Sequence, residues 1–274
     1  MEYEASSRSK DVGLQLSGTV ASHLREQIIS GKLKPGDYLR IDAIASEMGV
    51  STTPVREGLL LLHSESFVRL LPRRGFVVNS FGKDDLRDIF WAQAVVGAEL
   101  AARAAVKMSK EDLAKLQQLD AEHDKAFKAG DERHVRLGYE FHRFINLAAQ
   151  SPRLALLLGN LSRQLPIRFY ASIDGQVTDT LQYHPIILDA MRMKDGDAVR
   201  SMMFRHIMHG AEHLIDSLER AGTWGPPLEA ANAPTAQPLS ETVEPMDEPV
   251  GVPVARAAPA KALAKAKVAR GARR

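Results

Sequence analysis

The stretch Met48–Leu62, MGVSTTPVREGLLLL, decides the fold of the N-terminal part of this chain. Gly49 is a natural end for one helix, and the hydroxyls of Ser51 and the two threonines after it can cap the start of the next. Pro54 follows in the first turn, where proline is tolerated. Apolar side chains then recur at helical spacing: Val55, Leu59 and Leu62. A helix, a tight glycine turn and a capped second helix form the helix-turn-helix pattern.

The residues on both sides of this stretch complete a winged helix-turn-helix. Upstream, apolar spacing marks two more helices, with Val20, Leu24 and Ile28 in one and Ile41, Ile44, Ala45 and Met48 in the other. Downstream, two β-rich runs around the basic turn Pro72–Gly75 predict a hairpin, or wing. We therefore predict a DNA-binding domain over residues 17–80 and a flexible arm over residues 1–16.

The chemistry of this predicted domain is that of duplex recognition. A recognition helix presents its first turn to the major groove, and the free N–H groups there favour a phosphate. The predicted DNA contacts are Ser51, Thr52, Thr53 and Arg56 on the helix and Arg73, Arg74 and Gly75 at the wing tip. From the residues alone, an ordinary three-helix module with solvated arginines stays an alternative.

Residues 83–221 are almost free of proline and predict an all-α bundle. Amphipathic helices are expected over roughly 84–107, 110–129, 131–149, 152–170, 179–193 and 196–220. Short polar residues that can cap orphan N–H groups stand at the predicted starts, Ser109 and Asp195 among them. A bundle of this size can enclose a ligand pocket between its helices.

Three histidines stand among apolar residues on three different predicted helices: His142, His184 and His206. Neutral imidazoles are good ligands for zinc or nickel, and three of them with open positions make an ordinary coordination shell. The alternative is that these histidines only fill helix faces. His123 and His134 show no pattern beyond that of a helix surface.

Composition limits the classes of function. A chain of 274 residues fits about two domains, and the lack of Cys excludes disulfides and Cys-ligated zinc. The net charge of +2 neither demands nor excludes nucleic acid. No apolar run approaches the roughly 18 residues that span a bilayer, and the N-terminus lacks an apolar signal core. We expect a cytoplasmic protein without membrane contact.

The last stretch, residues 222–274, holds eight of the fourteen prolines and few large apolar residues. Such a composition predicts a disordered tail. Its end, from Arg256, carries seven Lys and Arg residues and no acid. These charges could assist DNA binding without reading sequence, or they could only increase solubility.

The N-terminal blocks resemble the GntR-type DNA-binding domain. The resemblance rests on Gly31–Asp37 (GKLKPGD), on MGVSTTPVREGLLLL and on LLPRRGFVV, in the expected order and spacing over about 60 residues. It implies a homodimer that binds operator DNA with a short inverted repeat. Two departures leave the operator sequence open, since family members usually carry Arg at the position of Thr52 and many have a basic or longer polar residue at that of Asp42.

Residues 83–221 resemble the helical FCD-type ligand-binding domain of the FadR-like branch of that family. The resemblance rests on EFHRFINLAAQSPRL, YHPIILDAMRMKDGDAV and SMMFRHI. Many members of the branch bind a divalent metal through one Asp and three His, and the three positions correspond to His142, His184 and His206. The Asp is expected one turn before His142, where this chain has Gly138. The resemblance thus implies a zinc or nickel site that lacks one ligand.

The resemblance also implies a small organic acid as the effector. The branch often places an arginine for the effector carboxylate in the first bundle helix, where this chain reads Trp91-Ala92-Gln93-Ala94. Arg163 and Arg168 could replace that arginine, and Asn146, one turn beyond His142, could also contact the ligand or metal.

We therefore predict a mainly α protein that regulates transcription, as a ligand-controlled repressor and not as an enzyme. Two other classes stay open from the residues. One is a helical metalloenzyme whose three histidines activate water, although no acid or base is visibly paired with them. The other is a constitutive architectural DNA-binding protein, in which the basic tail dominates and the bundle serves only for dimerisation.

Overall fold

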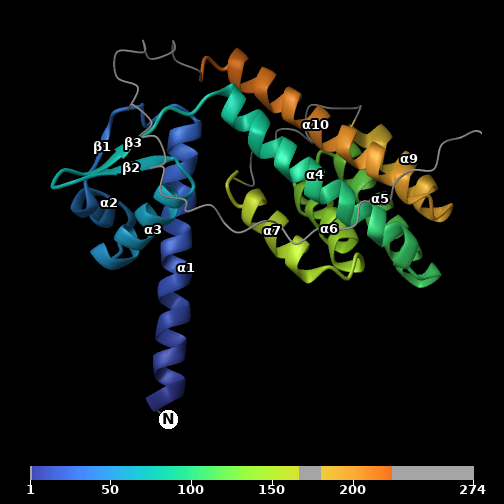
Figure 1. Cartoon of the computed structure of the whole chain (residues 1–274), viewed down its shortest axis with the longest axis horizontal. Helices are drawn as coiled ribbons and strands as arrows, with labels where there is room; N and C mark the ends of the chain where they lie inside the picture. The colour runs from blue at the N-terminus through green and yellow to red at the C-terminus, as the bar shows by residue number, and fades with distance from the viewer. Residues whose placement is uncertain (1, 167–179, 224–274) are drawn as a thin grey trace, which may run out of the picture. The chain divides into compact units, whose positions relative to one another are not determined.

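A computed structural model describes residues 2–166 and 180–223, with side chains described for 15–166 and 183–223. The described chain is mainly α-helical, with one small sheet, which confirms the predicted fold class. The N-terminal elements are α1 (Glu2–Ile29), β1 (Tyr38–Leu39), α2 (Ile41–Met48), α3 (Thr52–Ser64), β2 (Val68–Leu71) and β3 (Gly75–Val78), as labelled in Figure 1. Arg168 and the tail from residue 224 lie outside the described residues.

Helix α1 begins far earlier than the sequence predicts. Residues 2–16, expected as a loose arm, are helical and continuous with the predicted helix around Val20. This segment contains no proline and many good helix formers. Adding turns to an existing helix also avoids the unfavourable nucleation step, so the helix extends through the arm.

The helix-turn-helix follows the sequence pattern closely. Gly49 ends α2 in the left-handed region, with a φ of 65°, and its N–H donates to the carbonyl of Ala45. Helix α3 packs against α1 where Gly58 allows close approach, because a Cβ there would lie 2.9 Å from the carbonyl oxygen of Ser17. Val20, Leu59 and Leu62 are fully buried in this core, and Ile41 and Met48 are partly buried against it.

The wing is the predicted hairpin with one additional strand. β2 and β3 pair antiparallel, with Leu71 opposite Gly75, so a three-residue turn joins them. The additional strand, β1, pairs with the other edge of β3 and gives the order β1-β3-β2. Two residues, Tyr38 and Leu39, are too few to show a strand pattern in a sequence.

A buried ion pair ties α1 to the end of α3. Arg25 is 2% exposed, and its Nε and Nη2 both donate to Glu65 Oε2, at 3.0 and 2.6 Å. The guanidinium also lies 5.7 Å from the centre of the Phe67 ring. Burial raises the pKa of Glu65 above its usual value, and the charge of Arg25 opposes that rise. The pair fixes where α3 ends and where the wing begins.

The C-terminal helices match the predicted ones within a few residues in five of six cases. They are α4 (Lys83–Lys107), α5 (Lys110–Lys128), α6 (Arg133–Ala148), α7 (Pro152–Ser162), α9 (Thr180–Arg192) and α10 (Gly196–Arg220). Ser109 and Asp195 cap α5 and α10, and each side chain accepts an N–H bond at 3.0 Å. Helix α7 ends at Ser162 instead of the predicted 170, because Pro166 disfavours helical backbone in the residue before it.

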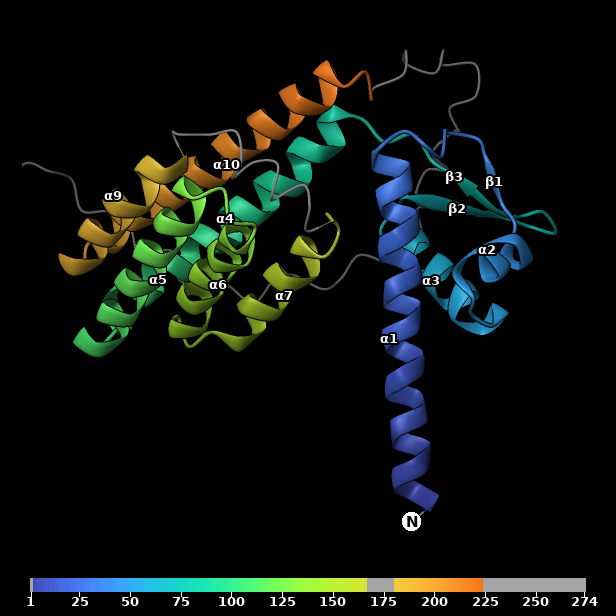
Figure 2. The same cartoon turned by 180° about the vertical axis from the view of Figure 1, so that it is seen from behind.

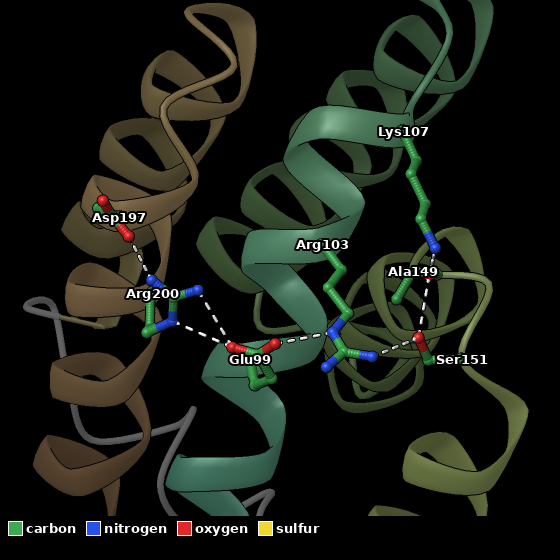
Figure 3. Close-up of polar contacts among 7 residues, drawn as sticks. All are labelled: Glu99, Arg103, Lys107, Ala149, Ser151, Asp197 and Arg200. Atoms are coloured by element: carbon green, nitrogen blue, oxygen red, sulfur yellow. Dashed lines mark hydrogen bonds and ion pairs between the residues drawn. The ribbon is translucent and has the colours of Figure 1, made fainter. Parts of the chain in front are cut away.

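Helices α4 and α10 lie side by side and antiparallel, in Figure 1 and from behind in Figure 2. Lys83 pairs with Glu219 near one end of the pair. At the other end Glu99 accepts from Arg200 at 3.1 Å and from Arg103 at 2.7 Å (Figure 3). These bonds lower the pKa of Glu99, with that from Arg103 as the largest cause.

Helix α4 is long and apolar enough to cross a membrane by length and composition. No such stretch was expected from the sequence. However, 56% of the apolar window is buried inside the structure, and its alanines, from Ala94 to Ala105, pack in the bundle core. The helix therefore has the properties of a core helix of a bundle.

Candidate nucleic-acid interface and metal centre

The first turn of α3 is open to solvent and carries the polar residues that the sequence singled out. Ser51 is the N-cap residue, and its hydroxyl makes no cap hydrogen bond. Thr52, Thr53 and Arg56 are exposed, whereas Pro54 and Val55 face the core. Hydroxyl groups, free backbone N–H groups and a guanidinium therefore share one exposed end of a helix, which is the donor set that a phosphate or a base edge accepts from.

The wing tip adds two more cations. Arg73 and Arg74 are exposed in the turn between β2 and β3, and the Arg74 N–H closes the turn on the carbonyl of Leu71 at 3.1 Å. Arg73 and Gly75 have φ values of 64° and 85°. Among the described residues, no carboxylate lies within ion-pair distance of Arg56, Arg73 or Arg74. These guanidinium groups are free for an external anion.

The bundle brings the three predicted histidines together from α6, α9 and α10. One ligand nitrogen of each lies within 4.8 Å of one nitrogen of the others. The Nε2 atoms of His142 and His206 are 3.2 Å apart, and the rings of His184 and His206 are 5.1 Å apart between centres. Side chains from three helices, far apart along the chain, thus converge on one point.

A carboxylate on α5 orients one of these histidines. Asp120 Oδ1 lies 3.0 Å from His184 Nδ1. An ionised carboxylate only accepts hydrogen bonds, so Nδ1 carries the ring proton and Nε2 presents a bare lone pair. His184 Nε2 is buried and has no hydrogen-bond partner in the described part of the chain. A carboxylate behind a ligand histidine is the usual second partner in metal sites.

His142 and His206 are neutral at physiological pH. Burial, the largest cause, lowers the pKa of His142 to about 3 and holds the pKa of His206 well below its usual value. The neighbouring imidazoles lower both further. Only a neutral imidazole binds a metal ion, so these side chains hold the required form without competition from protons.

The residues present fit a metal ion, although the ligand set differs from that of the FadR-like branch. Buried unpartnered ring nitrogens are costly, and His184 Nε2 is of this kind within the described residues. Position 138 is a buried glycine of α6 and offers no ligand atom. His142, His184 and His206 would hold the ion, and the remaining positions would go to water or a small ligand.

The structure leaves the three predicted effector contacts untested. Arg163 is exposed at the end of α7 and hydrogen-bonds to Asn160 one turn earlier. Asn146 is half-buried on α6, and Arg168 lies outside the described residues. Within the four-residue stretch that replaces the absent arginine, Gln93 is buried and donates to the carbonyl of Leu161 at 3.3 Å, so it joins α4 to α7.

Sequence reasoning missed the contribution of α5. His123, expected on the surface, is 1% exposed, and Asp120 was not singled out. The buried residues of α5 are Leu116, His123 and Ala126, which share one helix face. That spacing from Leu116 was the available signal, because positions i, i+7 and i+10 lie on the same side of a helix.

Comparison with known proteins matches both halves of the chain. Residues 16–78 match the family described as "Bacterial regulatory proteins, gntR family". Residues 88–209 match the family described as "FCD domain". The two matches do not overlap, and together they include the whole winged helix and most of the bundle.

Similar proteins come from several bacteria. The "HTH-type transcriptional regulator McbR" of Escherichia coli (strain K12) is 28% identical over 201 residues, which cover 70% of this chain and 89% of that protein. The "Uncharacterized HTH-type transcriptional regulator YdhC" of Bacillus subtilis (strain 168) is 25% identical, with 72% and 90% covered. The "HTH-type transcriptional repressor RspR" of Escherichia coli (strain K12) is 24% identical, with 73% and 90% covered.

A solved structure agrees with this similarity. The structure titled "E. coli McbR/YncC" has a TM-score of 0.56 and 26% identity, and the alignment covers 74% of this chain and 98% of that chain. Both domains therefore have a counterpart in one solved protein.

Proposed function

This chain is a DNA-binding transcriptional regulator of the GntR family, in its FadR-like branch, and from that premise we propose that it represses genes by binding an inverted repeat as a homodimer under the control of a metal-bound organic acid. It is a regulator and not an enzyme. The family is one of soluble regulators, and the proposed site of action is the cytoplasm. Repression is favoured by the name of the related repressor RspR.

The exposed first turn of α3 carries the proposal of operator contact. Ser51, Thr52 and Thr53 donate from hydroxyl groups, and Arg56 donates from a guanidinium that is free of any described carboxylate. Arg73 and Arg74, on a turn made compact by Gly75, hold the flanking backbone or enter the minor groove. Thr52 stands where relatives usually carry Arg, so this chain is proposed to read a different base at that position.

Operator contact is tested by fluorescence anisotropy on a duplex selected by the protein itself. Thr52→Arg is expected to change which base pair is preferred at one position of each half-site, because an arginine pairs in a bidentate way with guanine. Thr52→Val removes the hydroxyl at nearly constant volume and serves as the matched control. An unchanged preference with Thr52→Arg would contradict the assigned position of α3 in the groove.

The proposed metal is a zinc or nickel ion held by His142, His184 and His206. When bound, such an ion supplies a Lewis acid whose open positions accept a carboxylate oxygen. The support is the convergence of three ring nitrogens and the Asp120 bond that aims one of them. His184→Ala is expected to abolish the bound metal measured by elemental analysis of the purified protein, whereas His134→Ala, outside the cluster of three, keeps it. Wild-type protein that stays metal-free after incubation with zinc would refute this part.

The proposed effector is a small organic acid whose carboxylate binds at this ion, with Asn146 as a polar contact. Arg163 and Arg168 remain proposed carboxylate partners. The test is thermal unfolding with a series of short mono- and dicarboxylic acids, with and without metal. A ligand at roughly 100 times its Kd raises stability by about 2.7 kcal/mol. The expected stabilisation requires metal, and equal stabilisation of stripped protein would contradict the role of the ion.

The proposed dimer contact lies on the exposed face of α4. Trp91 is 55% exposed, and Val95, one turn later, is 43% exposed. The next turn carries Glu99 beside Arg103 and Arg200, so the face has both signs of charge and can complement a second copy of itself. Trp91→Glu is expected to give monomers in light scattering, while Tyr139→Glu, an equally exposed aromatic on α6, leaves dimers.

A further inference from the structure

A second group of ligand atoms lies beside the three-histidine cluster, on α5. Asp120, His123 and His184 each offer one ligand atom, and these atoms all lie within 4.8 Å of one another. The rings of His123 and His184 are 5.5 Å apart between centres. Helix α5 contacts both α6 and α9, and Figure 1 labels the three helices. Two groups of three ligands therefore share one member, His184.

The burial of His123 without hydrogen-bond partners points to a bound ligand. Its side chain is buried, and neither Nδ1 nor Nε2 has a hydrogen-bond partner within the described residues. A neutral imidazole has one N–H donor and one lone pair, and burying both without partners is unfavourable. Structural histidines normally reduce this cost by bonding through at least one ring nitrogen, as His134 does through Nδ1 to the carbonyl of Asp131, while its Nε2 has no partner within the described residues. A cation would bind the lone pair of His123, which has no partner within the described residues.

His123 also lies near the part of α6 where a carboxylate was expected and Gly138 stands instead. His134, Gly138 and His142 follow one another at four-residue spacing and so share a face of α6. The ring of His123 lies 6.3 Å from that of His134, and it also contacts His184, which contacts His142. His123 therefore lies near the face of α6 that carries Gly138. The carboxylate that α6 lacks has a counterpart in Asp120, which reaches His184 from the other side.

We propose that Asp120, His123 and His184 form a second position for a divalent cation, which shares His184 with the proposed three-histidine position. This inference rests on the proposed metal function and extends it. A neutral imidazole has a lone pair on one nitrogen only. His184 therefore serves one ion at a time: through Nε2 when its proton is on Nδ1 and held by Asp120, or through Nδ1 when its proton is on Nε2.

The two positions join different helices. An ion at the three-histidine position links α6, α9 and α10, whereas an ion at the second position links α5 to α9. Because the ring proton of His184 selects between them, the wild-type chain binds one ion. Moving that ion exchanges one set of helix contacts for another, which is the type of two-state element that an effector can bias.

The experiment is a cobalt(II) titration of stripped, full-length protein followed by visible absorption. Wild type is expected to bind one cobalt ion per chain. The double variant His142→Gln/His206→Gln removes the first position, and is expected to keep one cobalt ion per chain, at least about tenfold more weakly, with a changed spectrum. Adding His123→Gln to it is expected to abolish binding. Adding His134→Gln instead is the matched control and leaves binding in place.

The outcomes separate the two proposals. A double variant that binds no cobalt, next to a wild type that does, overturns the second position and leaves the three-histidine site intact. Two cobalt ions per wild-type chain overturn the sharing of His184. Wild type that binds none overturns both proposals. If the double variant fails to unfold cooperatively in urea, His142→Asn takes its place with the same comparison against His123→Gln.

Discussion

The DNA-binding region and the helical bundle place their functional charges in opposite environments. At the first turn of α3 and at the wing tip, three arginines are exposed and free of described carboxylates. In the bundle, His184 and His206 are 3% and 6% exposed, and burial holds the pKa of His206 well below its usual value. One surface offers charge to a partner that arrives from solvent. The bundle interior holds ring lone pairs that only a desolvated ion can reach.

These opposite environments determine how each region can be regulated. An exposed guanidinium binds a phosphate strongly at any pH near neutrality, and salt screens that interaction. A buried imidazole cluster responds to metal and to its own protonation instead, and it lies between helices that an ion can tie together. DNA binding and metal binding therefore use chemically different groups as well as different parts of the chain.

The largest expected effect is on the free energy of unfolding. It tests whether a buried ion pair in the DNA-binding region stabilises the fold more than an exposed ion pair does. Arg25→Met leaves Glu65 buried without its partner and should lower the free energy of unfolding by about 3–5 kcal/mol. The matched control is Lys83→Met, which breaks a half-exposed pair with Glu219 and should cost less than about 1 kcal/mol. Urea unfolding measures both. Equal losses of stability in the two variants would contradict the expectation that the buried pair stabilises the fold more than the exposed pair.

The next effect concerns the metal centre. Asp120→Asn keeps the shape of the side chain but removes the charge that fixes the ring proton of His184 on Nδ1. Metal affinity should fall by about 10- to 100-fold, as for other second partners of ligand histidines. Competition with a coloured chelator measures the change. Asp124→Asn on the same helix, whose carboxylate pairs with Lys128, should leave affinity unchanged, and the same loss in both variants would contradict the role of Asp120.

Arg56→Ala addresses the exposed side of the comparison. Operator binding should weaken by about 1–3 kcal/mol, because the variant removes a guanidinium that bonds to a base or holds a phosphate tightly. Arg153→Ala removes an exposed arginine of α7 and should leave the affinity unchanged. Fluorescence anisotropy at fixed salt measures both variants. If both bind like wild type, Arg56 is not in the interface.

Acid should act on the bundle in a defined direction. In the stripped protein the folded pKa of His142 is about 3 and that of His123 about 4, whereas the pKa of an unperturbed histidine is 6.5. The unfolded chain binds more protons between these values, so stability is full above a pH of about 6.5 and is lost as pH falls toward about 4. Urea unfolding of His142→Gln should show a smaller loss between about pH 7 and pH 5 than wild type. An identical loss would contradict the assigned pKa.

The smallest effect concerns the basic end of the tail. Deleting residues 222–274 should reduce the dependence of DNA affinity on salt, by about 0.9 in the logarithmic slope for each phosphate that the tail neutralises. The matched control is a protein shortened only by the acidic stretch, residues 223–254. A slope unchanged by the full deletion would show that the seven basic residues do not touch DNA.

The sequence predicted the winged helix better than the bundle interior for a physical reason. Gly49, the Ser51 cap position and the β-rich runs specify local backbone, so helices α2 and α3 and the hairpin follow from neighbouring residues. Helix α1 was underestimated, since cooperative extension of a helix leaves no boundary signal. The two-residue strand β1 depends on pairing with β3 and has no pattern of its own.

The metal centre could be predicted only in part. His142, His184 and His206 were identified from their apolar surroundings and from a family resemblance, and the structure brings them together. Asp120 and His123 come from a helix outside the three sequence blocks on which the resemblance rested, and their role depends on how α5 packs against α6 and α9. Residues that meet only through packing of distant helices give no local signal, although the spacing of His123 from Leu116 indicated burial.

Specific reading of an operator by the first turn of α3 is the proposal on which the regulatory function depends. It is tested by selecting duplexes from a random library with wild-type protein and with Arg56→Ala, followed by sequencing. We predict that wild type enriches an inverted repeat and that Arg56→Ala loses the enrichment at one position of each half-site. Wild type that enriches no sequence, or an Arg56→Ala variant that enriches the same repeat equally, would contradict the proposal.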